Sequence, residues 1–275
     1  MSAAGVSTEA LVLAAALWGA VAGALLPRAA YRFAVPAGEP WRERCGRGHP
    51  IRGWIGRTRC GRCAQEAVRE QRAMRERRAV RAGAKAREQE AALAPYAPSA
   101  ALLAVVTALV CAALAVATGT RPELGVWLLL APVWVLLAAV DVRVRRLPDP
   151  LTLPLAAAGP GLLALAALLP EHAGDWLTAL YGALALGGGY LALFLINPSG
   201  MGFGDVKLAL GMGAVLGWYG WPTLLLGTFA GFLFGALYGG ALVVARRAGR
   251  KTAVPFGPFL IAGAFTGLLI GAYAA

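Results

Sequence analysis

Long apolar runs separated by short polar connections dominate the pattern along this chain. Eight runs stand out, at roughly residues 10–26, 99–117, 124–140, 151–169, 177–196, 208–217, 223–245 and 256–274. Most contain at least 17 residues, and a helix of about that length crosses the roughly 30 Å of hydrocarbon in a bilayer. The pattern therefore predicts an all-α fold, a polytopic membrane helical bundle with about eight transmembrane spans.

The least regular part of this pattern is residues 208–245, which form either one long span or two thin ones. A single span would place the basic segment "RRAGRK" on the outer side, against the positive-inside rule. Pro222, with Trp218 and Trp221 beside it, is typical of a turn at the membrane interface. We therefore expect two crossings.

The charges are concentrated in one polar stretch. The chain is 59% hydrophobic and only 15% charged, with a net charge of +12, and 17 of its 26 Lys and Arg lie between Arg28 and Arg87. In a soluble protein this charge would favour nucleic acid, but in a polytopic protein the positive-inside rule assigns the stretch to the cytoplasm. We expect a multi-pass protein of the cytoplasmic (inner) membrane with its amino terminus outside, in contact with the lipid bilayer and with no nucleic-acid partner.

Two segments before residue 98 allow two interpretations each. The first run lacks a preceding basic residue and a following small-residue cleavage site, so we interpret it as a retained span rather than a signal peptide. Residues 64–92 are rich in Ala, Arg, Glu and Gln and predict a helix, either solvated or docked on a partner or lipid surface.

We divide the chain into residues 1–97, the first span with a basic Cys-containing loop, and residues 98–275, the membrane core.

Two aspartates flank apolar runs in this core. Asp141 ends the third run and Asp205 precedes the sixth, and the alternation of connections places both at the cytoplasmic edge. An ionisable residue in such a place is a candidate functional residue. Two carboxylates that meet share one proton, so that one acts as a base on water while the other acts as an acid. His49 and His172 lie elsewhere in this topology.

Residues around Asp205 have plain structural interpretations as well. Gly202 and Gly204 let two backbones approach each other, and small residues pack membrane helices routinely. Lys207 either extends its ammonium group to the lipid headgroups or favours the ionised form of Asp205.

Four motifs in order resemble the prepilin peptidase family, the membrane aspartic proteases of type IV pilin-like precursors. They are "GALLPRAAYRFAVP", "DVRVRRLPD", "GFGDVKL" and "VPFGPFL". The resemblance implies an aspartic endopeptidase that cleaves the leader peptide of prepilin-like (prepilin or pseudopilin) membrane protein substrates at the cytoplasmic face, with no cofactor for proteolysis. It makes Asp141 and Asp205 the catalytic pair, supported by Gly202, Gly204, Lys207, Pro255 and Gly257.

Two other functions also use aspartates in membranes. A presenilin-like intramembrane protease carries its first aspartate mid-helix after a tyrosine, whereas Asp141 follows Val140 at the end of a run. A proton-coupled transporter, which is not an enzyme, would place its carboxylates near the midplane.

The basic loop departs from the family pattern of two C-x-x-C pairs. "CGRC" supplies Cys60 and Cys63, while "CGRGH" keeps Cys45, has Gly48 in place of the second cysteine, and adds His49. A Cys₃His set suits structural zinc, and the alternative is a degenerate loop with free thiols. Larger members of the family also methylate the new amino terminus with S-adenosylmethionine. Pro27 replaces a family asparagine in the region implicated in methylation. The sequence does not decide between retention and loss of the methyltransferase activity.

Overall fold

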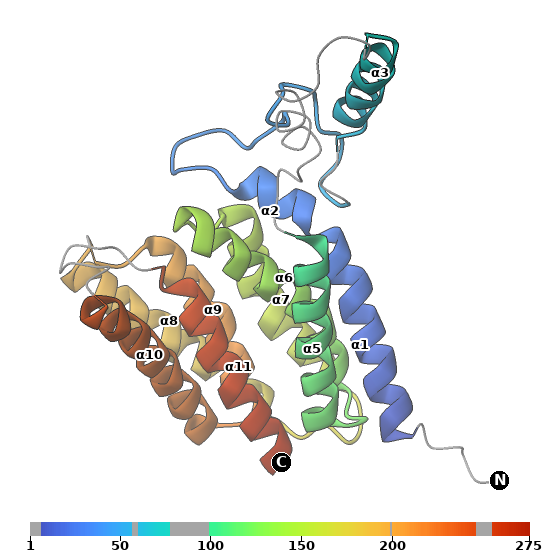
Figure 1. Ribbon diagram of the computed structural model, residues 1–275. Coiled ribbons are helices and arrows are strands. Elements are labelled where there is room, and N and C mark those ends of the chain that lie inside the picture. The colour runs from blue at the N-terminus through green and yellow to red at the C-terminus, as the bar shows by residue number, and fades with distance from the viewer. Residues whose placement is uncertain (1–6, 57–59, 78–98, 199, 246–254) are drawn as a thin grey trace.

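The computed structural model describes residues 7–56, 60–77, 99–198, 200–245 and 255–275 (Figure 1). Its helices, in chain order, are α1 (Thr8–Leu25), α2 (Pro27–Phe33), α3 (Gly61–Arg77), α5 (Ala100–Thr118), α6 (Glu123–Val144), α7 (Asp149–Ala166), α8 (Trp176–Ile196), α9 (Phe203–Gly217), α10 (Trp221–Val244) and α11 (Gly257–Ala274). These described ranges contain no β-strand beyond an isolated bridge between Arg44 and Pro50. The predicted all-α class is confirmed.

Seven helices in this part of the chain are long and apolar enough to cross a membrane. They correspond to seven of the eight predicted spans. The eighth, predicted at 208–217, is contained in α9, which has 15 residues and is mostly buried. The separate helices α9 and α10 confirm the break predicted near Pro222.

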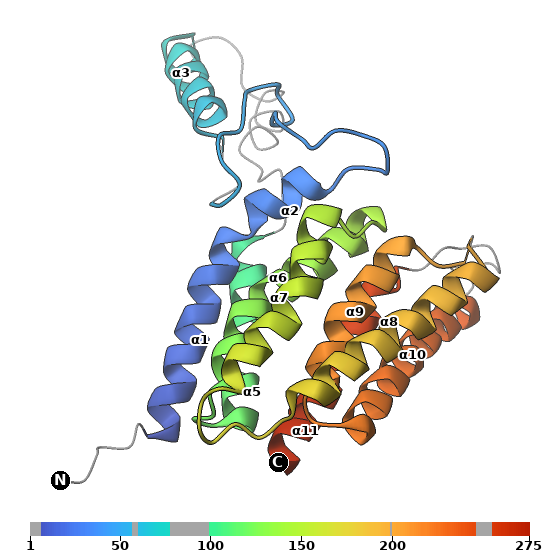
Figure 2. The same ribbon diagram turned by 180° about the vertical axis from the view of Figure 1, so that it is seen from behind.

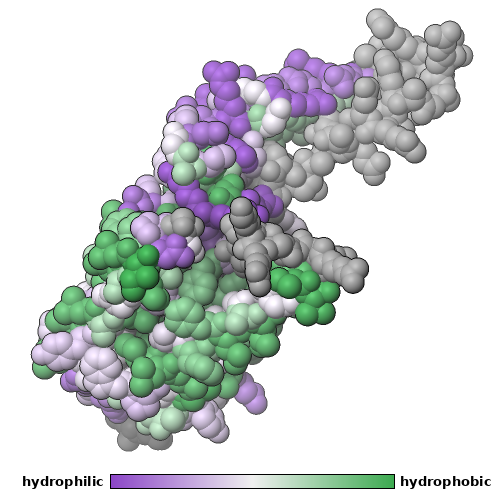
Figure 3. Space-filling view, turned by 90° about the vertical axis from the view of Figure 1, so that its left-hand side faces the viewer, coloured by the Kyte–Doolittle hydropathy of each residue, from purple (hydrophilic) through white to green (hydrophobic). Residues whose placement is uncertain are grey.

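Consecutive long helices run in opposite directions, so their ends gather at two ends of the bundle (Figures 1 and 2). Helix α9 lies in the middle and packs against α7, α8, α10 and α11, while α1 packs along α5. Helices α2 and α3 lie beyond one end, here called the α2 end, and the carboxyl terminus lies at the other. Hydrophobic residues cover much of the bundle, and hydrophilic residues gather toward the α2 end (Figure 3).

Small residues let the inner helices touch. A Cβ atom added to Gly213 of α9 would overlap the carbonyl oxygen of Gly182 in α8, and one on Gly263 of α11 would overlap the backbone of Gly231 in α10. Backbones this close exclude any larger side chain, which is how membrane helices gain packing energy without a hydrophobic effect between them. The position of α9 is therefore fixed by backbone contact on its α8 side.

Two helix ends differ by a turn from the boundaries that the apolar runs predict. Helix α6 continues past Asp141 and ends where Arg145 takes a left-handed conformation, with φ 51°, and donates its N–H to the Asp141 carbonyl oxygen. Helix α9 begins at Phe203, so Asp205 lies inside its first turn rather than before it. Charged residues can continue a helix beyond the hydrocarbon, which is why hydropathy alone ends these spans too early.

The basic loop rests on α2. Pro27 occupies the first position of α2, where a missing N–H costs nothing. Arg28 donates to the carbonyl oxygens of Arg52 and Ile55, and Arg32 donates to that of Gly53. The predicted helix 64–92 is described as α3 up to Arg77, and its remainder lies outside the described residues.

Candidate active site and metal centre

Asp141 points into the α2 end of the bundle from the last turn of α6. Its side chain is buried, with the residue only 4% exposed. Its Oδ2 accepts a hydrogen bond of 3.0 Å from the backbone N–H of Gly257, the first residue of α11. The first N–H groups of a helix have no partner within it and carry partial positive charge, so they favour a carboxylate. The amino-terminal end of α11 thus stabilises the Asp141 carboxylate.

Asp205 has the same kind of environment at a different helix. It is 8% exposed, and its Oδ2 accepts a 3.2 Å hydrogen bond from the backbone N–H of Gly202, the N-cap of α9. A side chain at the third position that reaches back to the N-cap N–H is half of a capping box. Asp205 therefore satisfies the amino-terminal end of its own helix.

The two carboxyl groups lie close enough to interact electrostatically. Two glycines of the proposed site, Gly204 and Gly257, share a neighbour in Leu147, which follows the end of α6. A Cβ atom on Gly204 would lie 2.9 Å from the Leu147 Cβ, and one on Gly257 would lie 2.8 Å from the Asp141 Oδ2 and 3.3 Å from the Leu147 Cδ2. Because these two positions lack a side chain, α9 packs closely against Leu147, and α11 packs closely against Leu147 and Asp141.

Lys207 forms an ion pair with an aspartate outside the proposed catalytic pair. Its Nζ lies 2.7 Å from Oδ1 of Asp149 at the start of α7, and 4.9 Å from the centre of the Phe203 ring. The sequence suggested that the Lys207 ammonium group either contacts lipid headgroups or supports Asp205. Neither interpretation included Asp149 as its partner. The pair connects the first turns of α7 and α9. Pro255 precedes α11, and Val254 of the same motif lies outside the described residues.

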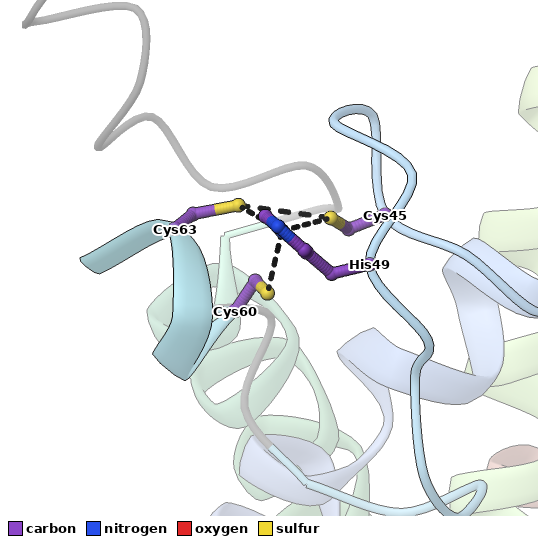
Figure 4. Close-up of side chains that lie close together, drawn as sticks. All are labelled: Cys45, His49, Cys60 and Cys63. Carbon is purple, nitrogen blue, oxygen red and sulfur yellow. Dashed lines mark hydrogen bonds between the residues drawn. The ribbon is translucent and has the colours of Figure 1, made fainter. Parts of the chain in front are cut away.

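Cys45, His49, Cys60 and Cys63 converge beyond α2 (Figure 4). Their ligand atoms all lie within 4.8 Å of one another. The His49 ring points among the sulfur atoms, with Nδ1 at 3.7 Å from Cys45 Sγ, 3.8 Å from Cys60 Sγ and 3.2 Å from Cys63 Sγ. All three are free cysteines.

The spacing of this cluster fits a tetrahedral metal ion. Thiolates at about 2.3 Å from zinc are about 3.8 Å from each other, and the Cys45 and Cys63 Sγ atoms are 3.7 Å apart. Burial raises the pKa of the Cys45 thiol, but N–H groups of Arg47 and His49 and the neighbouring thiols outweigh it and lower that pKa to about 7. Burial and the nearby thiols raise the pKa of Cys63 to about 12. Packed thiolates therefore need a cation, and a divalent metal supplies one.

Comparison with known proteins places this arrangement in a family. The sequence model of the type IV leader peptidase family matches residues 128–240, which include both aspartates. A prepilin leader peptidase/N-methyltransferase of Pseudomonas aeruginosa is 32% identical over 225 residues, 77% of this chain and 71% of that protein. Leader peptidase HopD of Salmonella typhimurium is 38% identical over 139 residues, 48% of this chain and 84% of that protein. The chain belongs to the type IV leader peptidase family.

The match to other relatives is shorter. A prepilin leader peptidase/N-methyltransferase of Aeromonas salmonicida is 36% identical over 180 residues, 62% of this chain and 57% of that protein. The chain thus spans less than two thirds of the length of some curated relatives that it matches. No solved structure matches it.

Sequence reasoning missed two residues near the site of this leader peptidase family member. Tyr190 of α8 is buried near Asp205, and its hydroxyl has no hydrogen-bond partner in the described part of the chain. Arg146 donates to the Pro36 carbonyl oxygen and covers the Trp41 ring, which links the turn after α6 to the basic loop. A tyrosine within an apolar run could have drawn attention to Tyr190. The contacts of Arg146 depend on the fold, and nothing in the sequence predicted them.

Proposed function

We propose that the chain is an aspartic endopeptidase that removes the leader peptide from type IV pilin-like precursors, with Asp141 and Asp205 as its catalytic pair. The observation that carries this proposal is the pairing of two buried, electrostatically coupled carboxylates at one end of the bundle. The names of the relatives, all leader peptidases, support the same activity.

The proposed reaction uses only these carboxylates and a water molecule. Two buried carboxyl groups that interact electrostatically resist ionising together, so in this scheme the pair shares one proton. The ionised carboxylate takes a proton from water as the water oxygen attacks the peptide carbonyl carbon, and the protonated carboxyl donates its proton to the oxyanion. The carbon–nitrogen bond then breaks, and the leaving amine takes the proton held by the first carboxylate. One hydroxyl of the diol returns its proton to the second carboxylate, which completes the new carboxylic acid and restores the one-proton pair.

Gly257 and Gly202 act before any substrate arrives in this scheme. Each fixes one oxygen of its aspartate with a backbone N–H, so the opposite oxygen of each is the one available to water. A rigid donor orients a catalytic group without cost at the moment of reaction.

The place of the pair suits a substrate that is itself held in the bilayer. We assign the α2 end to the cytoplasmic side of a bacterial inner membrane because 17 of the 26 basic residues lie between Arg28 and Arg87 in the sequence, and the described part of this stretch, with α2 and α3, lies at that end. A precursor with a hydrophobic helix after its leader dissolves that helix in the membrane. Its scissile bond then reaches the depth of the carboxylates.

Substitution of the aspartates tests the proposal. Asp141→Asn and Asp205→Asn should each reduce leader removal by at least about a thousandfold, and the double variant should be no worse than either, because residues that act as one unit are non-additive. Asp149→Asn is the control, since Asp149 is 59% exposed in its side chain and pairs with Lys207 instead. The readout is the gel shift of a cognate precursor in membranes.

An Asp205→Asn variant that is folded, membrane-inserted and processes at the wild-type rate would refute the aspartic mechanism. The mass of the new amino terminus in the same assay separates an unmodified amine from a methylated one. It thereby tests whether the methylation that two relatives carry in their names, which would use S-adenosylmethionine, occurs here.

For the cysteine cluster we propose a structural zinc ion held by Cys45, His49, Cys60 and Cys63. The spacing of the donors supports zinc, and zinc accepts thiolate and imidazole ligands together. Protein purified without chelator should contain about one zinc per chain, and Cys60→Ser/Cys63→Ser should contain none, because two ligands cannot hold the ion. Wild-type protein that contains no zinc after such a purification would contradict a zinc-binding role for the basic loop.

A further inference from the structure

The far side of the His49 ring has a partner of its own. While Nδ1 faces the three sulfur atoms, Nε2 lies 3.0 Å from Oε1 of Glu66. The carboxyl group of Glu66 is outside the cluster of candidate ligands, with a side chain 46% exposed. The imidazole is thus held between sulfur on one nitrogen and a carboxylate on the other.

This contact fixes which nitrogen can bind a metal. A neutral imidazole carries one N–H and one lone pair. A carboxylate at 3.0 Å from Nε2 favours the proton there, so the lone pair is left on Nδ1. Metal-ligating histidines commonly donate their second N–H to a carboxylate, which orients the ring and raises its basicity.

Glu66 is well placed for this because of α3. Cys63 and Glu66 are three residues apart on that helix, a spacing that puts both on one face. One helix therefore supplies a thiol and the acceptor for the histidine. The other side of the contact is a tight turn, in which the Cys45 N–H donates to the His49 carbonyl oxygen and Gly48 has φ +84°, a region that favours glycine.

We propose that Glu66 is the positioning residue that lets His49 serve as the fourth ligand in this chain. The inference rests on the zinc site proposed above. It assigns a role to a residue outside the ligand set, and that role exists only because the fourth ligand is an imidazole. A thiolate in its place would have no N–H to donate, so Glu66 would have nothing to orient.

A double-mutant cycle on zinc affinity tests this dependence. The full-length protein in detergent competes for zinc with a chromophoric chelator, without any measurement of peptidase activity. Glu66→Gln should weaken zinc binding by about ten- to a hundredfold, the range for loss of such a partner. Glu70→Gln, four residues further along α3 and exposed, is the matched control and should bind as wild type does.

The second arm repeats the substitution in a His49→Cys background. There Glu66→Gln should leave the affinity unchanged or improve it, since a fourth thiolate gains nothing from a carboxylate. Cobalt absorption spectra should show one nitrogen ligand in Glu66→Gln and none in His49→Cys, which verifies that each variant still forms the site.

The outcomes are distinct. Zinc binding by the wild type with an undiminished affinity in Glu66→Gln would overturn the role of Glu66 and leave the zinc site standing. An equal loss in the wild-type and His49→Cys backgrounds would also overturn it, because Glu66 would then act through general charge. A wild type that binds no zinc would end both the zinc proposal and this one, while the peptidase proposal would be unaffected.

Discussion

Gly257 donates its backbone N–H to Oδ2 of Asp141 at 3.0 Å, across 116 residues of sequence. The contact needs the absence of a side chain as much as it needs the donor. A Cβ atom at position 257 would lie 2.8 Å from that same oxygen and 3.2 Å from the carboxyl carbon. The first turn of α11 is therefore shaped to one proposed catalytic carboxylate.

Gly257→Ala should displace the Asp141 carboxylate and reduce leader removal by about a hundredfold, since small misplacements of a catalytic group have effects of that size. Gly188→Ala in α8 is the control, because a Cβ there meets nothing within 4 Å. Cleavage rates in membranes, with yields of folded protein measured beside them, check both variants. Wild-type cleavage by Gly257→Ala would contradict the proposed role of this contact.

Tyr190→Phe separates activity from stability. The ring packs on Phe232 and Phe256, with centroids 5.9 and 6.0 Å away, and phenylalanine keeps that packing. Losing a buried, unpartnered hydroxyl should leave thermal stability equal or higher, whereas losing the polar group that Tyr190 holds near Asp205 should lower kcat by about tenfold. Tyr181→Phe, 54% exposed on the same helix, should change neither quantity. Full activity in Tyr190→Phe would show that the hydroxyl has no part in the reaction.

Lys207 and Asp149 should behave as a pair with a small energy. Asp149 is exposed, and such ion pairs contribute about 0.2–1 kcal/mol. Lys207→Met and Asp149→Asn should each lower the cleavage rate less than tenfold, and the double variant should lose no more than the larger single loss. A Lys207→Met loss far above that of Asp149→Asn, with additive effects, would instead mean that the ammonium group serves Asp205.

The proposed orientation predicts opposite labelling of two exposed connections. A cysteine in place of His172 should react with a membrane-impermeant reagent in intact cells, and one in place of Pro198 should react only after permeabilisation. Both positions are exposed in the structure, so access differs only through the membrane. Labelling of both in intact cells, or of Pro198→Cys alone, would contradict a cytoplasmic position of Asp141 and Asp205.

Hydropathy was enough to predict the helices but not their ends. A span of apolar residues sets where a helix must be, because backbone groups in lipid have to be paired within it. Charge alone puts Asp141 and Asp205 outside their apolar runs, yet α6 continues to Val144 and α9 starts at Phe203. Capping geometry, which depends on φ at Arg145 and on the N-cap at Gly202, decided these ends.

Contacts between segments far apart in the chain could not be predicted from the sequence. The GxGD motif predicted that Asp205 matters, but nothing near it indicated that Lys207 would pair with Asp149. Likewise the four ligand candidates followed from residue type, whereas the Glu66 contact depends on how α3 meets the turn at His49. The residue types thus predicted which side chains could be catalytic or bind a metal. The contacts that those side chains make with distant residues could be found only from the fold.

The brevity of α9 gives the α2 end of the bundle, where the proposed catalytic pair lies, an unusual relation to the bilayer. Fifteen residues extend about 22 Å, roughly 8 Å less than the hydrocarbon that the neighbouring helices cross. A helix this short cannot reach both of the surfaces that the longer helices around it define. Helices α7, α8, α10 and α11 enclose it, so the bilayer does not have to thin around its ends. Asp205, buried in its first turn, is therefore bordered by protein rather than by lipid tails.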